Sequence, residues 1–369
     1  MKSWSEGTGT DQALNEGGDG MPAWILSRAL ARLAVCAWAV TAAAVAFAAE
    51  EVVYAGPGGT IANAYRQNVF PAFEKATGIK VTYVVGTVLE GLTKVEAQRA
   101  RPTIDVVTLT DDAYAQFRQK GLFEKLTSQL VPRLNAVYPA IRYEADDGVP
   151  MFILTTGIAY NTKIFKEKGF TPPTSIQDLW KPEFRNRIVL WTPATTTGVL
   201  ELLLVAKANG GSENNVDPAF AKLRELSPYV EFNKADEMTS LMQREQAWLG
   251  WWNNIRVQQL KAQGLPIELI GPKEGTPVYT NGVALVKGGP NRDNAIKLIN
   301  FILSDDGQTL IAQHIGGGPV VQTVVLPPNL ASQVPYGDAV RSGIFVADMN
   351  AVVKNRGSWL ERWAKEIER

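Results

Sequence analysis

Glycine and threonine residues stand where the chain is expected to pass from a strand into a helix. Gly58 and Gly59 precede a predicted helix that opens at Thr60. The unpaired backbone N–H groups at such a helix start, together with the positive end of the helix dipole, favour an anion or a ligand oxygen. A plain β–α turn with a threonine cap is the alternative explanation of the same residues.

A second helix start of this kind lies near the middle of the sequence. Trp191 ends a predicted strand, and Thr195, Thr196 and Thr197 come just before an apolar helix. A capped helix is the simpler explanation, but three consecutive threonines exceed what capping needs. The hydroxyl groups are therefore candidates for contact with a ligand.

Tryptophan is concentrated in the segment Trp248–Asn254. One interpretation is a buried strand in which Trp248 and one of Trp251 and Trp252 belong to the core, because neighbouring residues of a strand face opposite sides. The other is an aromatic wall of a cleft that binds a small molecule. The sequence alone leaves both interpretations open.

The composition argues against metal, thiol and nucleic-acid chemistry. The chain has one cysteine, Cys36, and one histidine, His314, too few for a Cys₄ or Cys₂His₂ zinc site. Its 37 basic residues balance 37 acidic ones, so it lacks the long-range field with which a nucleic-acid-binding protein collects its partner. It has no nucleophile elbow, H-E-x-x-H motif or Walker loop. We expect a binding protein with no cofactor, no metal and no catalytic residues.

Repeated β–α–β units must position the first helix start. Apolar runs and helical spacing predict strands at 51–55, 79–85 and 104–109, with helices at 61–76 and 89–99 between them. Such units form a parallel sheet with helices on both faces. Ligands bind at the carboxyl ends of these strands, so three loops should share one edge: Gly56–Thr60, Gly86–Thr87 and Thr108–Asp112.

Two long β stretches, at 148–161 and 282–287, enclose a self-contained α/β segment. A segment inserted between two crossing strands produces two lobes joined by hinges. We therefore predict an α/β fold with two lobes, each a mostly parallel sheet flanked by helices. The expected bounds are 50–152 with 277–318 for the first lobe and 153–276 with 319–369 for the second.

The first 49 residues carry the pattern of an exported protein. Arg28 and Arg32 precede an uncharged apolar stretch that ends in small residues at Ala49. This is typical of a secretory signal peptide, and the stretch is shorter than the roughly 20 residues of a membrane-spanning helix, which is the alternative. Residues 1–20 are polar and rich in glycine, so Met21 is the expected start. We predict cleavage near Ala49, and a mature chain in the periplasm.

Eight segments occur in the order and spacing of a known family: Tyr54–Thr60, Phe73–Val81, Ile104–Val107, Lys120–Leu122, Gly157–Lys163, Asp178–Phe184, Gly271–Gly275 and Ala295–Leu303. Together they resemble the family 1 extracellular solute-binding proteins, and most of all their polyamine-type branch. The resemblance covers about Val52 to Ala312. It implies the type II periplasmic binding protein fold, in a protein that closes on a small molecule and delivers it to the permease and ATPase subunits of an ABC importer. We expect such a protein to be a monomer.

The resemblance also indicates residues that contact the ligand. It places Trp252 and Asn253 in the cleft, where the family has an aromatic residue, and it matches Tyr279–Asn281 to a ligand-contacting stretch. With the helix starts and the loops at the sheet edge, the candidate ligand-binding residues are Gly58, Gly59, Thr60, Gly86, Thr87, Thr110, Asp111, Trp191, Thr195, Thr196, Thr197, Trp252, Asn253, Tyr279 and Asn281.

This chain differs from the polyamine branch at residues that would contact the charged groups of the ligand. Polyamine receptors hold ammonium groups with carboxylates at two places where this chain has Asn281 and the run Ala194–Thr197. A buried ammonium without a carboxylate is costly, so we expect an anionic or zwitterionic ligand, a carboxylate or a phosphonate. Asp111 and Asp112 could replace the missing charge, so spermidine or putrescine stays the alternative. An iron-binding protein, or an enzyme on the same fold, is less favoured.

Overall fold

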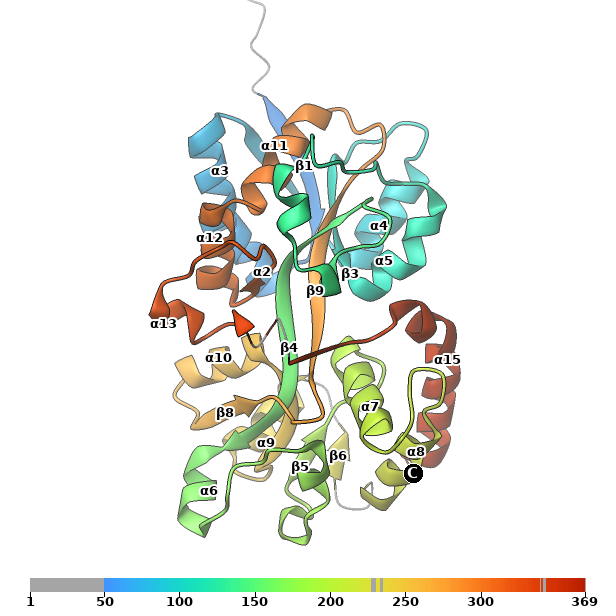
Figure 1. The fold of residues 1–369 in the computed structure, drawn as a ribbon, viewed down its shortest axis with the longest axis vertical. Coiled ribbons are helices and arrows are strands. Elements are labelled where there is room, and N and C mark those ends of the chain that lie inside the picture. The colour runs from blue at the N-terminus through green and yellow to red at the C-terminus, as the bar shows by residue number, and fades with distance from the viewer. Residues whose placement is uncertain (1–49, 227–229, 233–234, 339, 341–342, 369) are drawn as a thin grey trace, which may run out of the picture. The chain divides into compact units, whose positions relative to one another are not determined.

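The computed structural model describes residues 50–226, 230–232, 235–338, 340 and 343–368. The predicted signal peptide, residues 1–49, lies outside the described residues. Within the described part of the chain, no helix is long and apolar enough to cross a membrane. Figure 1 shows the arrangement of the helices and strands.

The first part of the chain forms the predicted parallel β–α–β units. Strand β1 (Glu51–Gly56) pairs in parallel with β2 (Lys80–Val85) and with β3 (Val106–Thr110). The single helix predicted at 61–76 is confirmed, with one π-helical turn inside it. The helices of this part are α2 (Gly59–Ala64), the π-helical turn η1 (Tyr65–Val69), α3 (Phe70–Thr77), α4 (Val88–Ala97) and α5 (Asp111–Phe117).

Two long strands cross between the two parts of the sheet, as predicted. Strands β4 (Val149–Asn161) and β9 (Thr276–Leu285) pair with each other in antiparallel fashion. Every antiparallel ladder between named strands of the described chain involves β4 or β9. The predicted α/β fold class is therefore confirmed: parallel ladders lie on both sides of two crossing strands (Figure 1).

The segment between the crossing strands forms a second set of parallel ladders. Strand β5 (Ile188–Leu190) pairs in parallel with β6 (Val230–Phe232) and with β7 (Leu249–Asn253). The sheet order is β2-β1-β3-β9-β4-β7-β5-β6, and β8 (Ile267–Ile270) pairs with β4. The helices of this segment are α6 (Thr162–Lys168), α7 (Thr196–Ala208), α8 (Asp217–Leu226), α9 (Ala235–Gln243) and α10 (Asn254–Ala262).

The C-terminal part contributes to both sides of the crossing strands. Its elements are α11 (Arg292–Ile302), α12 (Asp305–Ile315), β10 (Gly318–Pro319), α13 (Pro328–Ala331), β11 (Ile344–Val346) and α15 (Met349–Glu366). Short 3₁₀ turns complete the chain at η2 (Arg118–Lys120), η3 (Pro132–Ala136), η4 (Pro139–Ile141), η5 (Ile176–Trp180) and η6 (Pro182–Phe184).

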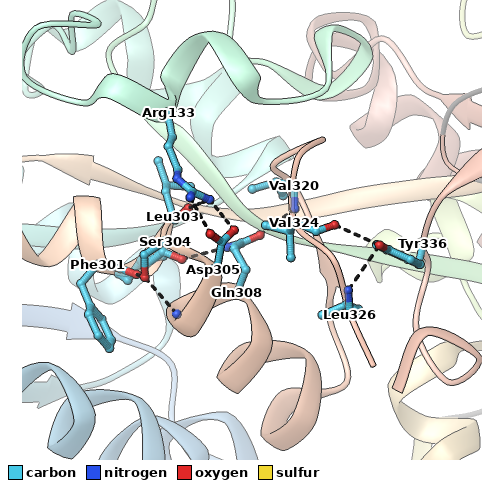
Figure 2. Close-up of polar contacts among 12 residues, drawn as sticks. Arg133, Phe301, Leu303, Ser304, Asp305, Gln308, Val320, Val324, Leu326 and Tyr336 are labelled. Carbon is cyan, nitrogen blue, oxygen red and sulfur yellow. Dashed lines mark hydrogen bonds and ion pairs between the residues drawn. The ribbon is translucent and has the colours of Figure 1, made fainter. Parts of the chain in front are cut away.

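Polar contacts fasten the connection that follows α12 (Figure 2). The buried amide of Gln308 donates to the carbonyl of Met151 at 2.8 Å and accepts from the N–H of Val320 at 2.8 Å. Arg133 forms two 2.7 Å bonds with Asp305 at the start of α12. Gln308 thus ties the connection after α12 to the crossing strand β4, and Arg133 of η3 ties down the start of α12.

Buried side chains define what we call the first lobe and the second lobe. The first lobe packs around β1 and β3, and the second packs around β5 and β7 with α7, α8 and α15. The predicted lobe bounds stay a prediction, but the cores argue for one change. Val320, Val324, Leu326 and Val340 pack in the first-lobe core, whereas Phe345 and later residues pack in the second. We therefore propose that the last crossing lies near residue 343 rather than near Gly318.

Candidate functional site

Three loops of the first lobe lie along one edge of the sheet, as the sequence predicts. They follow β1, β2 and β3, which are neighbouring strands in the order β2-β1-β3. The N–H of Gly86 donates to the carbonyl of Gly56 at 3.1 Å, and the Tyr83 hydroxyl donates to the carbonyl of Pro57 at 2.6 Å. These bonds fix the first two loops to each other and to β2.

Exposed backbone forms the start of α2. Gly58, Gly59 and Thr60 are exposed, and no side chain caps the helix. Gly59 has a φ angle of 71°, a left-handed conformation that glycine adopts without the steric cost of a Cβ atom. The structure therefore leaves these backbone N–H groups open, and their contact with a ligand stays a prediction.

Thr87 caps α4, the next helix on the edge. Its hydroxyl accepts from the N–H of Glu90 at 3.1 Å, and its own N–H donates to the Glu90 carboxylate at 2.6 Å. Glu90 is exposed, and these bonds hold its pKa below the usual value. The hydrogen bonding of Thr87 is thus explained by the reciprocal capping box, independently of a ligand.

Asp111 ties the start of α5 to the crossing strand β9. Its carboxylate accepts from the N–H of Thr280 at 2.6 Å, from the Thr280 hydroxyl, and from the Tyr143 hydroxyl at 3.3 Å. Burial raises the pKa of Asp111 to about 6, although the Thr280 hydrogen bonds oppose this shift. Asp111 therefore fixes a hinge strand, at the point where the β3–β9 ladder ends with the pair Thr110 and Asn281.

Asp112, the neighbouring acid, is paired in a different way. One of its oxygens accepts from the Thr110 hydroxyl at 2.6 Å, and the other forms a 3.2 Å ion pair with Arg356 of α15. Both acids that could have replaced the missing polyamine-binding carboxylates are therefore already engaged within the protein.

The second lobe presents the start of α7. Thr195 caps this helix, since its hydroxyl accepts from the N–H of Gly198 at 3.0 Å. Thr196 is partly exposed, and its hydroxyl makes no hydrogen bond with the described residues. Thr197 is buried beside Tyr279 of β9; burial raises the Tyr279 pKa, and a hydrogen bond with the Thr197 hydroxyl opposes that rise. The three threonines thus have three different environments.

Trp191 and Trp252 form an aromatic pair behind this helix start. Their rings meet edge to face at 6.1 Å, and the Trp191 indole N–H donates to the carbonyl of Trp251 at 2.6 Å. Trp252 is fully buried in the second-lobe core, so the partly exposed ring at this edge is Trp191. Trp251 is buried on the opposite face of β7, and Trp248 is partly exposed rather than in the core.

Two asparagines complete the predicted set. Asn253 caps α10, with its side-chain oxygen accepting from the N–H of Arg256 at 2.9 Å. Asn281 lies on β9 with 7% of its surface exposed. Its amide makes no hydrogen bond with the described residues, and the amide atoms are not fully sealed from solvent. Asn281 is therefore a stronger candidate for a ligand contact than Asn253.

A buried carboxyl group stands behind the α7 start. One oxygen of Glu201 accepts from the N–H of Trp191 at 3.3 Å, and the other has no partner in the described chain. Burial raises the pKa of Glu201 well above its usual value and so disfavours the charged form. The hydrogen bond of Glu201 supports the strand end at Trp191.

A cavity of about 330 Å³ lies where the two lobes meet beside β9. Its lining includes Asp111, Tyr143, Tyr279 and Thr280, together with Asp348 at the start of α15. Another cavity of about 400 Å³ is lined by α10, β8 and residues 331–336, and it contains none of the predicted site residues. Among the described residues, no group of three or more His, Cys, Asp or Glu side chains is placed to bind a metal ion.

Three residues that shape the site were not predicted from the sequence. Arg356 reaches both lobes, Tyr143 supports Asp111, and Asn254 donates to the carbonyl of Gly316 while accepting from the N–H of Thr155. Tyr143 and Arg356 lie in segments without a motif, far from their partners in sequence. For Asn254 a signal existed, because it ends the unusual Trp248–Asn254 segment.

These features describe two lobes joined by crossing strands, with the candidate helix starts α2, α4 and α5 on one lobe and α7 on the other. Residues 68–335 match the family described as bacterial extracellular solute-binding protein. This chain belongs to that family, whose members are transport proteins rather than enzymes.

Three relatives show the range of the family. A spermidine/putrescine-binding periplasmic protein of Haemophilus influenzae is 30% identical over 258 residues, which cover 66% of this chain and 69% of the relative. A protein of Salmonella typhimurium named for 2-aminoethylphosphonate binding is 28% identical over 276 residues, covering 70% and 74%. A solved structure of a GABA receptor has a TM-score of 0.70 at 25% identity, covering 85% and 97%. The chain is thus a solute-binding protein of the periplasmic ABC-transporter type.

Proposed function

We propose that this protein is the periplasmic receptor of an ABC importer for a small zwitterion that carries a carboxylate or phosphonate group. The start of α7 is the observation that carries the proposal. Thr196 offers a hydroxyl that has no partner among the residues the structure describes, and the first N–H groups of a 13-residue helix have no partner within the helix. Together with the helix dipole, these donors suit a negatively charged group.

The acids near the site support this choice over a polyamine. Asp111 is bound to Thr280, Asp112 is paired with Arg356, and burial raises the pKa of Glu201 well above its usual value. A polyamine carries two or more ammonium groups, each of which needs a carboxylate or a comparable set of acceptors when it is buried. Within the described residues of the site, two of these carboxylates already have a partner, and burial disfavours the charged form of the third.

The names of the relatives point to a positive group at the other end of the ligand. Spermidine, 2-aminoethylphosphonate and GABA share a primary ammonium group, and the last two also carry an acid. In this chain, the amide oxygen of Asn281, which no described residue bonds, and the partly exposed ring of Trp191 are suitable groups to contact one ammonium. One ammonium and one acid make the proposed ligand a zwitterion.

Calorimetric titration of the mature protein tests the ligand class. The probes are 2-aminoethylphosphonate, GABA, putrescine and spermidine. We expect the two zwitterions to bind, and Thr196→Ala and Thr197→Ala to weaken binding by about 1–3 kcal/mol, or roughly 5- to 150-fold, because they remove hydrogen bonds to a charged group. Thr162→Ala is the control, since Thr162 begins α6 outside the site.

The polyamine alternative predicts a different pattern. Spermidine would bind tightly, Asp111→Asn and Asp112→Asn would abolish binding, and the threonine variants would have little effect. That result would overturn the proposed ligand class and leave the family unchanged.

The proposal includes export and delivery. The relatives named above as periplasmic support removal of residues 1–49, and we expect periplasmic material to begin near Glu50 on N-terminal sequencing. Retention of Met1 or Met21 would contradict this.

The mature protein is proposed to act as a monomer with permease and ATPase subunits, and its ligand should be recovered chemically unchanged after binding. Small-angle scattering should show a smaller radius of gyration when ligand closes the lobes.

A further inference from the structure

Arg356 has contacts on both sides of the candidate site. It lies on α15, whose residues Val352, Trp359 and Trp363 pack in the second-lobe core. Its Nε donates to the carbonyl of Pro193 at 3.2 Å, and its Nη2 donates to the carbonyl of Ala194 at 2.5 Å. Its Nη1 pairs with Asp112 at 3.2 Å. Each nitrogen of the guanidinium therefore has a partner.

The two carbonyls belong to the turn that leads into α7. Thr195, the cap of α7, directly follows Ala194. A planar guanidinium that binds two successive carbonyls fixes the orientation of the peptide groups between them, which a lysine with one nitrogen cannot do. Arg356 thus holds the turn that directly precedes the α7 start, although it is distant from that turn in sequence.

The remaining partner belongs to the first lobe. Asp112 lies on α5, whose residues Tyr114 and Phe117 pack in a first-lobe core. Of the ion pairs between described residues, Arg356–Asp112 is the one that joins the two lobe cores. Their side chains are 25% and 24% exposed, so water and salt screen this pair less than a fully exposed one.

We propose that Arg356 is a positioning residue of the ligand site with two separable roles. Its bonds to Pro193 and Ala194 orient the α7 start, and its ion pair with Asp112 latches that start to the first lobe. This inference deepens the proposed function, because the α7 start is the part of the site assigned to the ligand's acid group. The latch itself is independent of which ligand binds.

Two measurements on the mature protein separate the roles. Hydrogen exchange of peptides that cover residues 192–199 reports the turn, and small-angle scattering without ligand reports the spacing of the lobes. Arg356→Ala should raise the exchange and enlarge the radius of gyration. Arg356→Lys should raise the exchange alone, because a single ammonium keeps the ion pair but not both carbonyls. Asp112→Asn should enlarge the radius alone.

Arg362→Ala is the matched control on the same helix. Arg362 pairs with Asp217 and Glu366, both in the second lobe, so its removal should change neither measurement. If 2-aminoethylphosphonate binds, Arg356→Ala should weaken it roughly tenfold, within the usual range for coupling between sites. If none of the probes binds, the proposed ligand class fails while exchange and scattering still test the latch. Arg356→Ala that matches Arg362→Ala in both measurements would overturn the inference.

Discussion

The α4 and α5 starts of the first lobe and the α7 start of the second lobe differ in how far the protein itself satisfies their polar groups. On the first lobe, Thr87 is bound by Glu90, Thr110 by Asp112, and Asp111 by Thr280. On the second lobe, one threonine caps α7, and the hydroxyl of Thr196 has no partner among the described residues. A polar residue at a helix start is therefore a ligand candidate only after its capping partners have been accounted for.

Substituting one glycine in each lobe, Gly59 and Gly198, should show the largest difference in unfolding free energy. A Cβ atom at Gly198 would lie 2.0 Å from the carbonyl oxygen of Thr192, which is backbone and cannot rotate away, whereas at Gly59 nothing lies within 4 Å. We expect Gly198→Ala to cost about 3 kcal/mol of unfolding free energy and to displace the α7 start. Gly59→Ala should cost about 1 kcal/mol, through its positive φ alone.

Denaturant titrations of both glycine variants measure these costs, and calorimetry with 2-aminoethylphosphonate measures the effect on the site. Equal stability losses in the two variants would remove the distinction between a packed and an open helix start.

The next effect concerns the pH dependence of stability through Asp111. Its pKa is about 6 in the folded protein, against 3.8 for the ordinary group, so between roughly pH 4 and 6 the folded protein binds a proton that the unfolded chain has released. The free energy of unfolding should therefore fall as the pH rises through this window, by about 2 kcal/mol. Asp111→Asn should lack this component.

The measurement is the difference between wild type and Asp111→Asn in denaturant titrations from pH 4 to 7. Asp306→Asn is the control, because it removes an exposed carboxylate of α12 that makes no contact with the Asp111 cluster. A difference between wild type and Asp111→Asn that stays constant over this range would contradict the assignment.

The smallest expected effect compares two helix caps. Thr87→Ala and Thr195→Ala each remove one capping bond, so each should lower the free energy of unfolding by about 1 kcal/mol. Only Thr195→Ala should also weaken ligand binding, because the α7 start carries the proposed acid-binding groups. Thermal unfolding and calorimetry on the same samples check both parts, and equal loss of affinity in the two variants would count against the asymmetry of the site.

Local patterns in the sequence predicted much of the fold. The alternation of apolar runs located β1, β2 and β3 within one or two residues, and the parallel arrangement then required their loops to share an edge. The two crossing strands were also predicted, since each is a long apolar run that interrupts the β–α rhythm. These features depend on residues close together in the chain.

The hydrogen bonds and ion pairs that the site residues make within the protein could not be predicted in the same way. Asp111 and Thr280 are 169 residues apart, and Asp112 and Arg356 are 244 apart, so only the folded arrangement decides that they meet. The strand period predicted that Trp251 and Trp252 face opposite sides, but not that helices bury both faces of β7. The sequence likewise did not show which of the three consecutive threonines caps α7, because that depends on the exact residue at which the helix begins.

The crossing strands have a consequence for how the chain acquires its structure. Strand β4 is synthesised before β7, β8 and β9, with which it forms its main ladders, and the first-lobe core is completed by residues up to Val340. Pairings over such long loops form slowly, because the entropy of loop closure must be overcome before the contacts stabilise the fold. A nascent chain therefore lacks a complete core until nearly all of it has been made. Under the proposed export, this delay would keep the chain unfolded while it crosses the membrane as an extended polypeptide.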